Sequence, residues 1–162
     1  MVKFNLEYCV KEKKWLSFIE EATISRDVGR LLEETLSELN VETDAIIELS
    51  ITFTNDSRIQ KINKKFRQKD TPTNVLSFPL YEKEFFNISK KESYIALGDI
   101  VLSLETIIAE ANELGITFKS HLNHLIIHSI LHLLGFDHKN KLEEKNMERL
   151  EKTILDILNR PF

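Results

Sequence analysis

The sequence has a single cysteine, which excludes a disulfide-stabilised protein and a metal site built from several cysteines. With only Cys9 among 162 residues, no disulfide can form within the chain. Because Cys9 lies in a segment where apolar and polar residues alternate, we expect it to be a small buried residue rather than a nucleophile. Any metal ion must then be held by histidines and carboxylates.

Long apolar runs and an excess of basic residues are also missing. The longest stretch without Asp, Glu, Lys or Arg is 120–136, which is polar in places and shorter than the ~20 apolar residues that cross a bilayer. The N-terminal residues lack the basic and apolar regions of a secretory signal, so we expect a cytoplasmic protein. The formal net charge of −4 gives no general support for a nucleic-acid partner, so any RNA contact needs a local basic surface.

The hydrophobic pattern predicts a mixed order of strands and helices. Alternation indicates strands at 2–8, 45–54, 73–81 and 94–103, the third ending or bulging at Pro79 and the fourth with a bulge or close approach at Gly98. Helical spacing indicates helices at 15–39 with a restart near 23–25, then at 55–70, 104–115, the histidine stretch and 142–158. We therefore expect an α+β fold, in which residues 1–162 form a single domain with a four-stranded mixed sheet packed against about five helices.

All five histidines fall in the segment "HLNHLIIHSILHLLGFDH", which begins at residue 121. On a helix, His124, His128 and His132 lie on one face, but the outer two are about 12 Å apart and cannot share one ion. Gly135 is placed to end the helix in a left-handed conformation and turn the chain, which would bring His138 back over His128 and His132. A single histidine on an apolar helix is most often a core residue, whereas these three together predict a metal site at the C-terminal helices.

Three histidines leave one coordination position open, as in catalytic zinc sites. We expect His124 to line the cavity beside the metal, His121 to be a helix-start or surface residue, and Asp137 either to orient a ligand or to be an exposed turn residue. Zinc proteases with this spacing carry a glutamate directly after the first histidine, where this chain has Ser129. A protease therefore lacks its general base here, while the metal site remains.

A local basic segment accompanies the histidines. Between Arg58 and Lys69 there are six basic residues and no acidic one. Taken alone, the basic segment is explained equally well as a helix face exposed to solvent or as a binding surface. Beside a hydrolytic metal it suggests a track for a phosphate backbone, with Arg67 the best placed to contact a phosphate through two hydrogen bonds.

The segments "HSILHLLGFDH", "FRQKDTPTNVLSFP" and "LGDIVLS" resemble, in the same order, the signature segments of the bacterial YbeY family of rRNA maturation endoribonucleases. The resemblance covers essentially the whole chain. It implies a zinc-dependent, single-strand-specific endoribonuclease that acts in ribosomal RNA maturation, notably at the 3′ end of 16S rRNA, and in ribosome quality control. It further implies one zinc ion on His128, His132 and His138, with Arg67 as the functional arginine. The expected partners are single-stranded rRNA and the ribosome or its proteins, with no DNA and no membrane.

One position departs from the family pattern, since the family usually has glycine where this chain has Ser129. No general base is assigned; Ser77, Asp99 and Asp137 are the polar residues nearest the motifs. Two other functions remain open at this stage. The chain could be a non-catalytic ribosome-assembly factor with a structural zinc or, with less support, a zinc metalloprotease.

Overall fold

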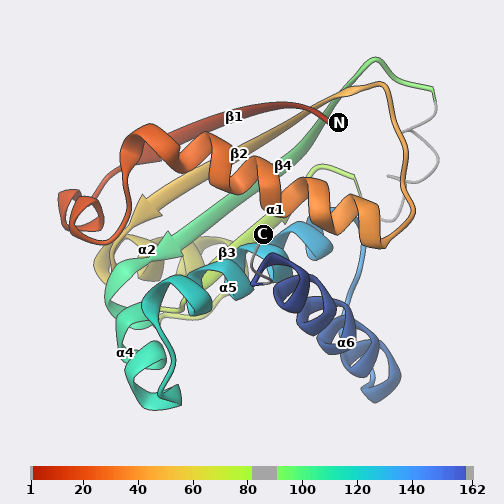
Figure 1. Cartoon of the computed structure of the whole chain (residues 1–162). Helices are drawn as coiled ribbons and strands as arrows, with labels where there is room; N and C mark the ends of the chain where they lie inside the picture. The colour runs from red at the N-terminus through yellow and green to blue at the C-terminus, as the bar shows by residue number, and fades with distance from the viewer. Residues whose placement is uncertain (1, 82–90, 160–162) are drawn as a thin grey trace.

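In a computed structural model, the structure describes residues 2–81 and 91–159 as strands and helices around one sheet (Figure 1). The elements in chain order are β1 (Lys3–Val10), η1 (Lys13–Ser17), η2 (Glu21–Thr23), α1 (Ile24–Glu38), β2 (Ile46–Thr54), α2 (Asp56–Arg67), β3 (Val75–Pro79), β4 (Tyr94–Ser103), α4 (Leu104–Leu114), α5 (Phe118–Leu133) and α6 (Lys141–Leu158). The described part of the chain thus contains four strands and five α-helices. The predicted α+β class is confirmed.

The sheet is mixed, as predicted. Its strand order is β1-β2-β4-β3; β1, β2 and β4 are parallel, and β3 is antiparallel to β4. β3 is therefore an edge strand, which is consistent with its end at Pro79, because proline cannot donate to a ladder. β3 also packs against α5, the helix that carries four of the five histidines.

Helices cover the two faces of the sheet unequally. Alternate residues of β2 and β4, such as Leu49 and Leu97, point to one face and form the main core with α1 and α5. In β4, Val101 points to the opposite face of the sheet. There it packs with Ile59 of α2 and Leu76 of β3 in a small second cluster. In Figure 1, α1 runs across the first face while α2 lies near the end of β4.

Within the region 15–39, which was predicted to be helical, only the second part forms an α-helix. The restart predicted near residues 23–25 is observed, because α1 begins at Ile24, but the residues before it form the short 3₁₀ turns η1 and η2. Trp15 explains the interruption: its side chain is fully buried and its indole N–H donates to the carbonyl of Thr54, 2.8 Å away. Anchoring a large ring across the end of β2 sets the chain direction there more strongly than helical spacing does.

The prediction that Cys9 is buried is wrong, since its side chain is exposed. In β1 it lies in alternation with Glu7 and Asn5, on the face away from α1, and β2 is the only strand beside β1 within residues 2–81 and 91–159. Alternation correctly predicted a strand, but which of its faces is covered depends on helices far away in the sequence.

Gly98 permits a close approach between β4 and β3, as expected. Its φ is 139°, and a Cβ atom there would lie 2.1 Å from the carbonyl oxygen of Phe78. The ladder of β2 and β4 is also irregular close by, between Glu48 and Ser50. This glycine therefore lets the β3 edge, and with it one wall of the site described below, lie tightly against the sheet.

Among residues 2–81 and 91–159, no helix is both long and apolar enough to cross a membrane.

Candidate metal centre

The helix α5 places three of the histidines on one face. It begins after Thr117, whose hydroxyl accepts a hydrogen bond from the backbone N–H of Ser120, and it ends at Leu133. Two residues later Gly135 has a φ of 103°, in the left-handed region predicted for it. The chain then turns, and His138 returns toward the helix.

This turn brings His128, His132 and His138 together, as the spacing predicted. One ring nitrogen from each lies within 4.8 Å of the other two, and the group could hold a metal ion. The ring centroids of His132 are 4.5 Å from those of His128 and 5.0 Å from those of His138. The other two histidines of the chain are outside this group.

The hydrogen bonds of two of these rings decide which nitrogen faces the centre. The Nδ1 atom of His132 lies 3.0 Å from the carbonyl oxygen of Phe136, which can only accept, so Nδ1 carries the hydrogen. The Nδ1 atom of His128 likewise donates to a carboxylate oxygen of Glu151, 2.5 Å away. In the neutral rings, both Nε2 atoms therefore carry lone pairs, and these atoms face each other 3.0 Å apart.

Two acceptor atoms at this distance repel each other unless a proton or a cation lies between them. On one tetrahedral zinc ion, two imidazole nitrogens at about 2.0–2.1 Å from the metal are about 3.3 Å apart. The observed 3.0 Å separation is close to that value. The residues present thus fit a divalent metal ion bound by imidazoles, and a set of three neutral ligands leaves room for further ligands.

Glu151 of α6 joins two histidines of α5. One carboxylate oxygen accepts from His128, and the other lies 2.8 Å from Nε2 of His124. Burial by itself raises the pKa of Glu151, but the hydrogen bonds from His124 and His128 outweigh it and lower the pKa to about 2. Glu151 is therefore ionised at neutral pH although it is only 5% exposed.

The pKa of His132 is also lowered, but for an imidazole this favours the neutral form. Its partial burial, followed by the nearby charges of His128 and His138, lowers the pKa of His132 to about 4. A ring that stays neutral well below its ordinary titration range keeps its lone pair available for a metal ion.

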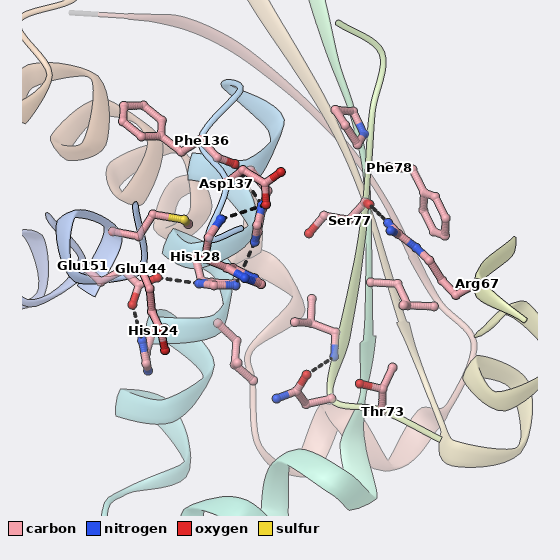
Figure 2. Close-up of a pocket in the computed structure, with 18 of the residues that line it drawn as sticks. Arg67, Thr73, Ser77, Phe78, His124, His128, Phe136, Asp137, Glu144 and Glu151 are labelled. Atoms are coloured by element: carbon pink, nitrogen blue, oxygen red, sulfur yellow. Dashed lines mark hydrogen bonds and ion pairs between the residues drawn. The ribbon is translucent and has the colours of Figure 1, made fainter. Parts of the chain in front are cut away.

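An open cavity of about 1130 Å³ extends from the three histidines to the edge of β3 (Figure 2). On the far wall Arg67, from the last turn of α2, donates a hydrogen bond of 2.9 Å to the carbonyl oxygen of Ser77 and lies over the ring of Phe78. The side chain of Ser77 points from β3 toward the histidines. The cavity therefore has imidazoles on one side and a fixed guanidinium group on the other.

The remaining predicted residues are placed as follows. His124 lines the cavity, as expected. Of the two interpretations of His121, the structure favours the helix start, because it lies in the first turn of α5 and is buried, with Nε2 3.0 Å from Glu110. It is covered where α5 packs against α4. Of the two interpretations of Asp137, the structure favours the turn, because its carboxylate accepts from the backbone N–H of His138.

Three polar residues near the motifs also have definite positions. Ser77 and Asp137 line the cavity, whereas Asp99 is not among the residues that line it.

Ser129 is fully buried, and its hydroxyl has no hydrogen-bond partner among the described residues. Since Ser129 follows His128 by one residue, it points about 100° away around the helix and leaves the space beside the histidines unchanged.

Sequence reasoning missed Glu151. A signal was present, because Glu151 lies in the buried stripe of α6 between Met147 and Ile154, where a charged residue without a partner is costly. Its partners in α5 are 23 and 27 residues away, so the spacing that identified the histidines could not identify it.

Three histidines around an open coordination site, facing a cavity with a fixed arginine, define this α+β protein as a candidate metal-dependent hydrolase. Comparison with known proteins gives the family. Residues 9–159 match the family model "Endoribonuclease YbeY", so the chain belongs to the YbeY endoribonuclease family.

Curated relatives are similar over most of the chain. The Endoribonuclease YbeY of Bartonella bacilliformis is 46% identical over 126 residues, covering 78% of this chain and 77% of the relative. That of Agrobacterium fabrum is 36% identical over 163 residues, covering 98% and 93%. The fold is similar to the solution structure of TM1509 from Thermotoga maritima, with a TM-score of 0.60 and 23% identity over 94% of this chain and 87% of that one.

Proposed function

We propose that this protein is a zinc-dependent endoribonuclease that cleaves single-stranded ribosomal RNA during maturation of the 3′ end of 16S rRNA and in ribosome quality control. Residues 1–162 act as one domain, with one zinc ion per chain on His128, His132 and His138. Family membership supports the nuclease class. The single observation that carries the mechanism is the facing pair of Nε2 lone pairs on His128 and His132.

Zinc bound to these imidazoles supplies Lewis-acid chemistry for water and for a phosphoryl oxygen. The chain's own residues provide the rest. The carbonyl of Phe136 and the carboxylate of Glu151 hold two of the imidazoles with their lone pairs turned inward. Arg67, held by Ser77 and Phe78 on the opposite wall, presents the rest of its guanidinium group to the cavity and stabilises the charge that develops on the phosphate.

The charge distribution of the cavity favours an extended, single-stranded substrate. Arg67 and Lys69 line one side, and the acidic Glu144 and Glu148 of α6 line another. An RNA strand would place its phosphate backbone along the α2 side, away from the carboxylates of α6. A ribosomal RNA substrate also implies the ribosome as partner and the cytoplasm as the place of action.

The test is cleavage of a labelled RNA that spans the 3′ end of 16S rRNA and its precursor extension. The purified protein should cut it, and should cut a generic single strand faster than a duplex. The His132→Ala variant and the chelated protein should be inactive. Binding without cleavage at every metal tested would instead support a ribosome-assembly factor with a structural zinc, and cleavage of casein but not RNA would support a protease.

A further inference from the structure

We infer that Glu151 is a positioning residue of the metal centre: it holds the ring of His128 with Nε2 toward the ion, and His124 holds Glu151 in place. This inference rests on the proposed metal-binding function and deepens it. It assigns a role to a buried acid on α6 and to His124, one of the two histidines of α5 that lie outside the three-histidine group.

Burying the Glu151 carboxylate costs free energy unless both of its oxygens are hydrogen-bonded. Its side chain is 7% exposed and lies in the apolar stripe of α6 with Met147 and Ile154. An ionised carboxylate in such a place is tolerated only when both oxygens have hydrogen-bond donors. The two donors are the ring nitrogens of His124 and His128, so the acid and the two imidazoles form one connected unit.

The bond to His128 affects metal binding in three ways. It fixes the tautomer, with the hydrogen on Nδ1 and the lone pair on Nε2. It fixes the rotation of the ring, because a hydrogen bond to the Glu151 carboxylate is directional. It also makes the imidazole a stronger donor and brings one negative charge close to a site of three neutral ligands and a divalent ion.

His124 lies one helical turn before His128, and its side chain is 40% exposed on the cavity wall. It is not placed to bind the same ion, but its Nε2 occupies the second oxygen of Glu151. Without that contact the carboxylate could rotate away from His128. His124 therefore acts on the metal only through Glu151.

The ring of His132 is held in a different way from the ring of His128. The Nδ1 of His132 is held by a backbone carbonyl, that of Phe136, and the turn after α5 fixes its position. His128 instead depends on a side chain from another helix, across the packing of α5 on α6. Changing residue 151 should thus weaken one ligand specifically and leave the helix and its other ligand in place.

The experiment measures zinc affinity directly, by competition of the metal-free protein with a chromophoric chelator. Glu151→Gln keeps the size of the side chain but removes the charge and one acceptor. We expect about 10–100-fold weaker zinc binding. The metal-free variant should be less stable than the wild type, because the two imidazoles lose a carboxylate acceptor, so zinc affinity is compared under conditions in which circular dichroism shows the variant to be folded. Cobalt in place of zinc should give an altered visible spectrum, because the donor strength of His128 changes.

Glu148→Gln is the matched control. Glu148 is on the same helix and lines the same cavity, but no hydrogen bond joins it to a histidine in the part of the chain that the structure describes. The zinc affinity of the Glu148→Gln protein should stay within about threefold of wild type, as expected when an exposed charge is removed. His124→Asn should give a smaller loss than Glu151→Gln, and it carries the test if the Glu151 variant does not fold.

Wild-type zinc affinity in folded Glu151→Gln and His124→Asn would overturn the inference. So would a loss of zinc that only follows a loss of the metal-free fold, because this indicates a structural role. If the wild type itself bound no zinc, the proposed metal function would fail and the inference with it. If zinc bound and responded to Glu151 but RNA was not cut, only the nuclease function would fail.

Discussion

The Nε2 atoms of His128 and His132 lie 3.0 Å apart, and the Nδ1 atom of each ring is bound on its other side, to Glu151 and to the Phe136 carbonyl. Two lone pairs are therefore directed at one point, with His138 beside them. Two lone pairs at this distance repel each other unless a proton or a metal ion lies between them.

Removing His132 should abolish stable metal binding. The His132→Ala variant loses one of the three proposed ligands, and we expect its zinc affinity to fall by more than about 100-fold, beyond the range for residues that only support a ligand. The ring is partly buried, so the metal-free variant should remain folded. Equilibrium dialysis with zinc measures the affinity, and circular dichroism checks the fold. Retention of one zinc per chain in the folded variant would exclude His132 as a ligand.

Arg67→Ala should slow RNA cleavage by about 100-fold in kcat while leaving zinc binding intact, since a group that stabilises developing charge acts mainly in the transition state. Arg67→Lys should recover only a small part, because a lysine lacks the planar fork that binds Ser77 and stacks on Phe78. Single-turnover kinetics separates this effect from RNA binding.

Lys64→Ala is the matched control for Arg67. Lys64 is on the same helix and is exposed, in an ion pair of 3.7 Å with Asp70, and it does not line the cavity. This variant should weaken RNA binding slightly and in a salt-dependent way, with kcat unchanged. Equal losses of kcat in the Lys64 and Arg67 variants would show that only the general charge of α2 matters.

The metal-free protein should lose stability as the pH falls from about 6.5 to about 4. Burial, followed by the charges of His128 and His138, lowers the pKa of His132 to about 4, so across this range the unfolded chain carries a proton that the folded chain does not. This contribution to the free energy of unfolding is fully present above the unfolded pKa and is lost as the pH falls toward the folded one. Urea unfolding at several pH values measures it. His132→Asn should flatten this part of the profile; an unchanged profile would contradict the assignment.

Gly98→Ala should destabilise the protein by about 3 kcal/mol or more, because a strained backbone and a steric overlap add together. A Cβ there would lie 2.1 Å from the Phe78 carbonyl oxygen, which cannot move without separating β3 from β4. Gly115→Ala is the control: it has a left-handed φ of 68° but nothing within 4 Å, and should cost only about 1–2 kcal/mol. Chemical unfolding gives both values, and equal losses would mean that contact with β3 is unimportant.

The sequence predicted the histidine group because its geometry is local. Spacing of four residues on a helix, a glycine after its end and one more histidine beyond the turn are all set within eleven residues, and helix geometry is nearly the same in every protein. The four strands were predicted for a similar reason, since alternation of apolar and polar residues is a local property.

What could not be predicted depends on contacts between distant segments. Cys9 is exposed and His121 is buried because of where helices pack, and Glu151 meets its histidines only when α6 lies against α5. The buried anchor Trp15 likewise replaced an expected helix with 3₁₀ turns by bonding to Thr54. In each case the residue type was visible in the sequence, but its partner was not.

A zinc titration of the metal-free protein, with cleavage of a labelled single-stranded RNA followed at each step, tests whether a metal ion on the three histidines is needed for cleavage. Cleavage should be absent without metal, rise in proportion to added zinc and level off at one ion per chain. The His138→Ala variant should stay inactive throughout. Full cleavage by the metal-free protein, or cleavage by a folded His138→Ala variant at the wild-type rate, would show that RNA cleavage does not depend on a metal ion at these histidines.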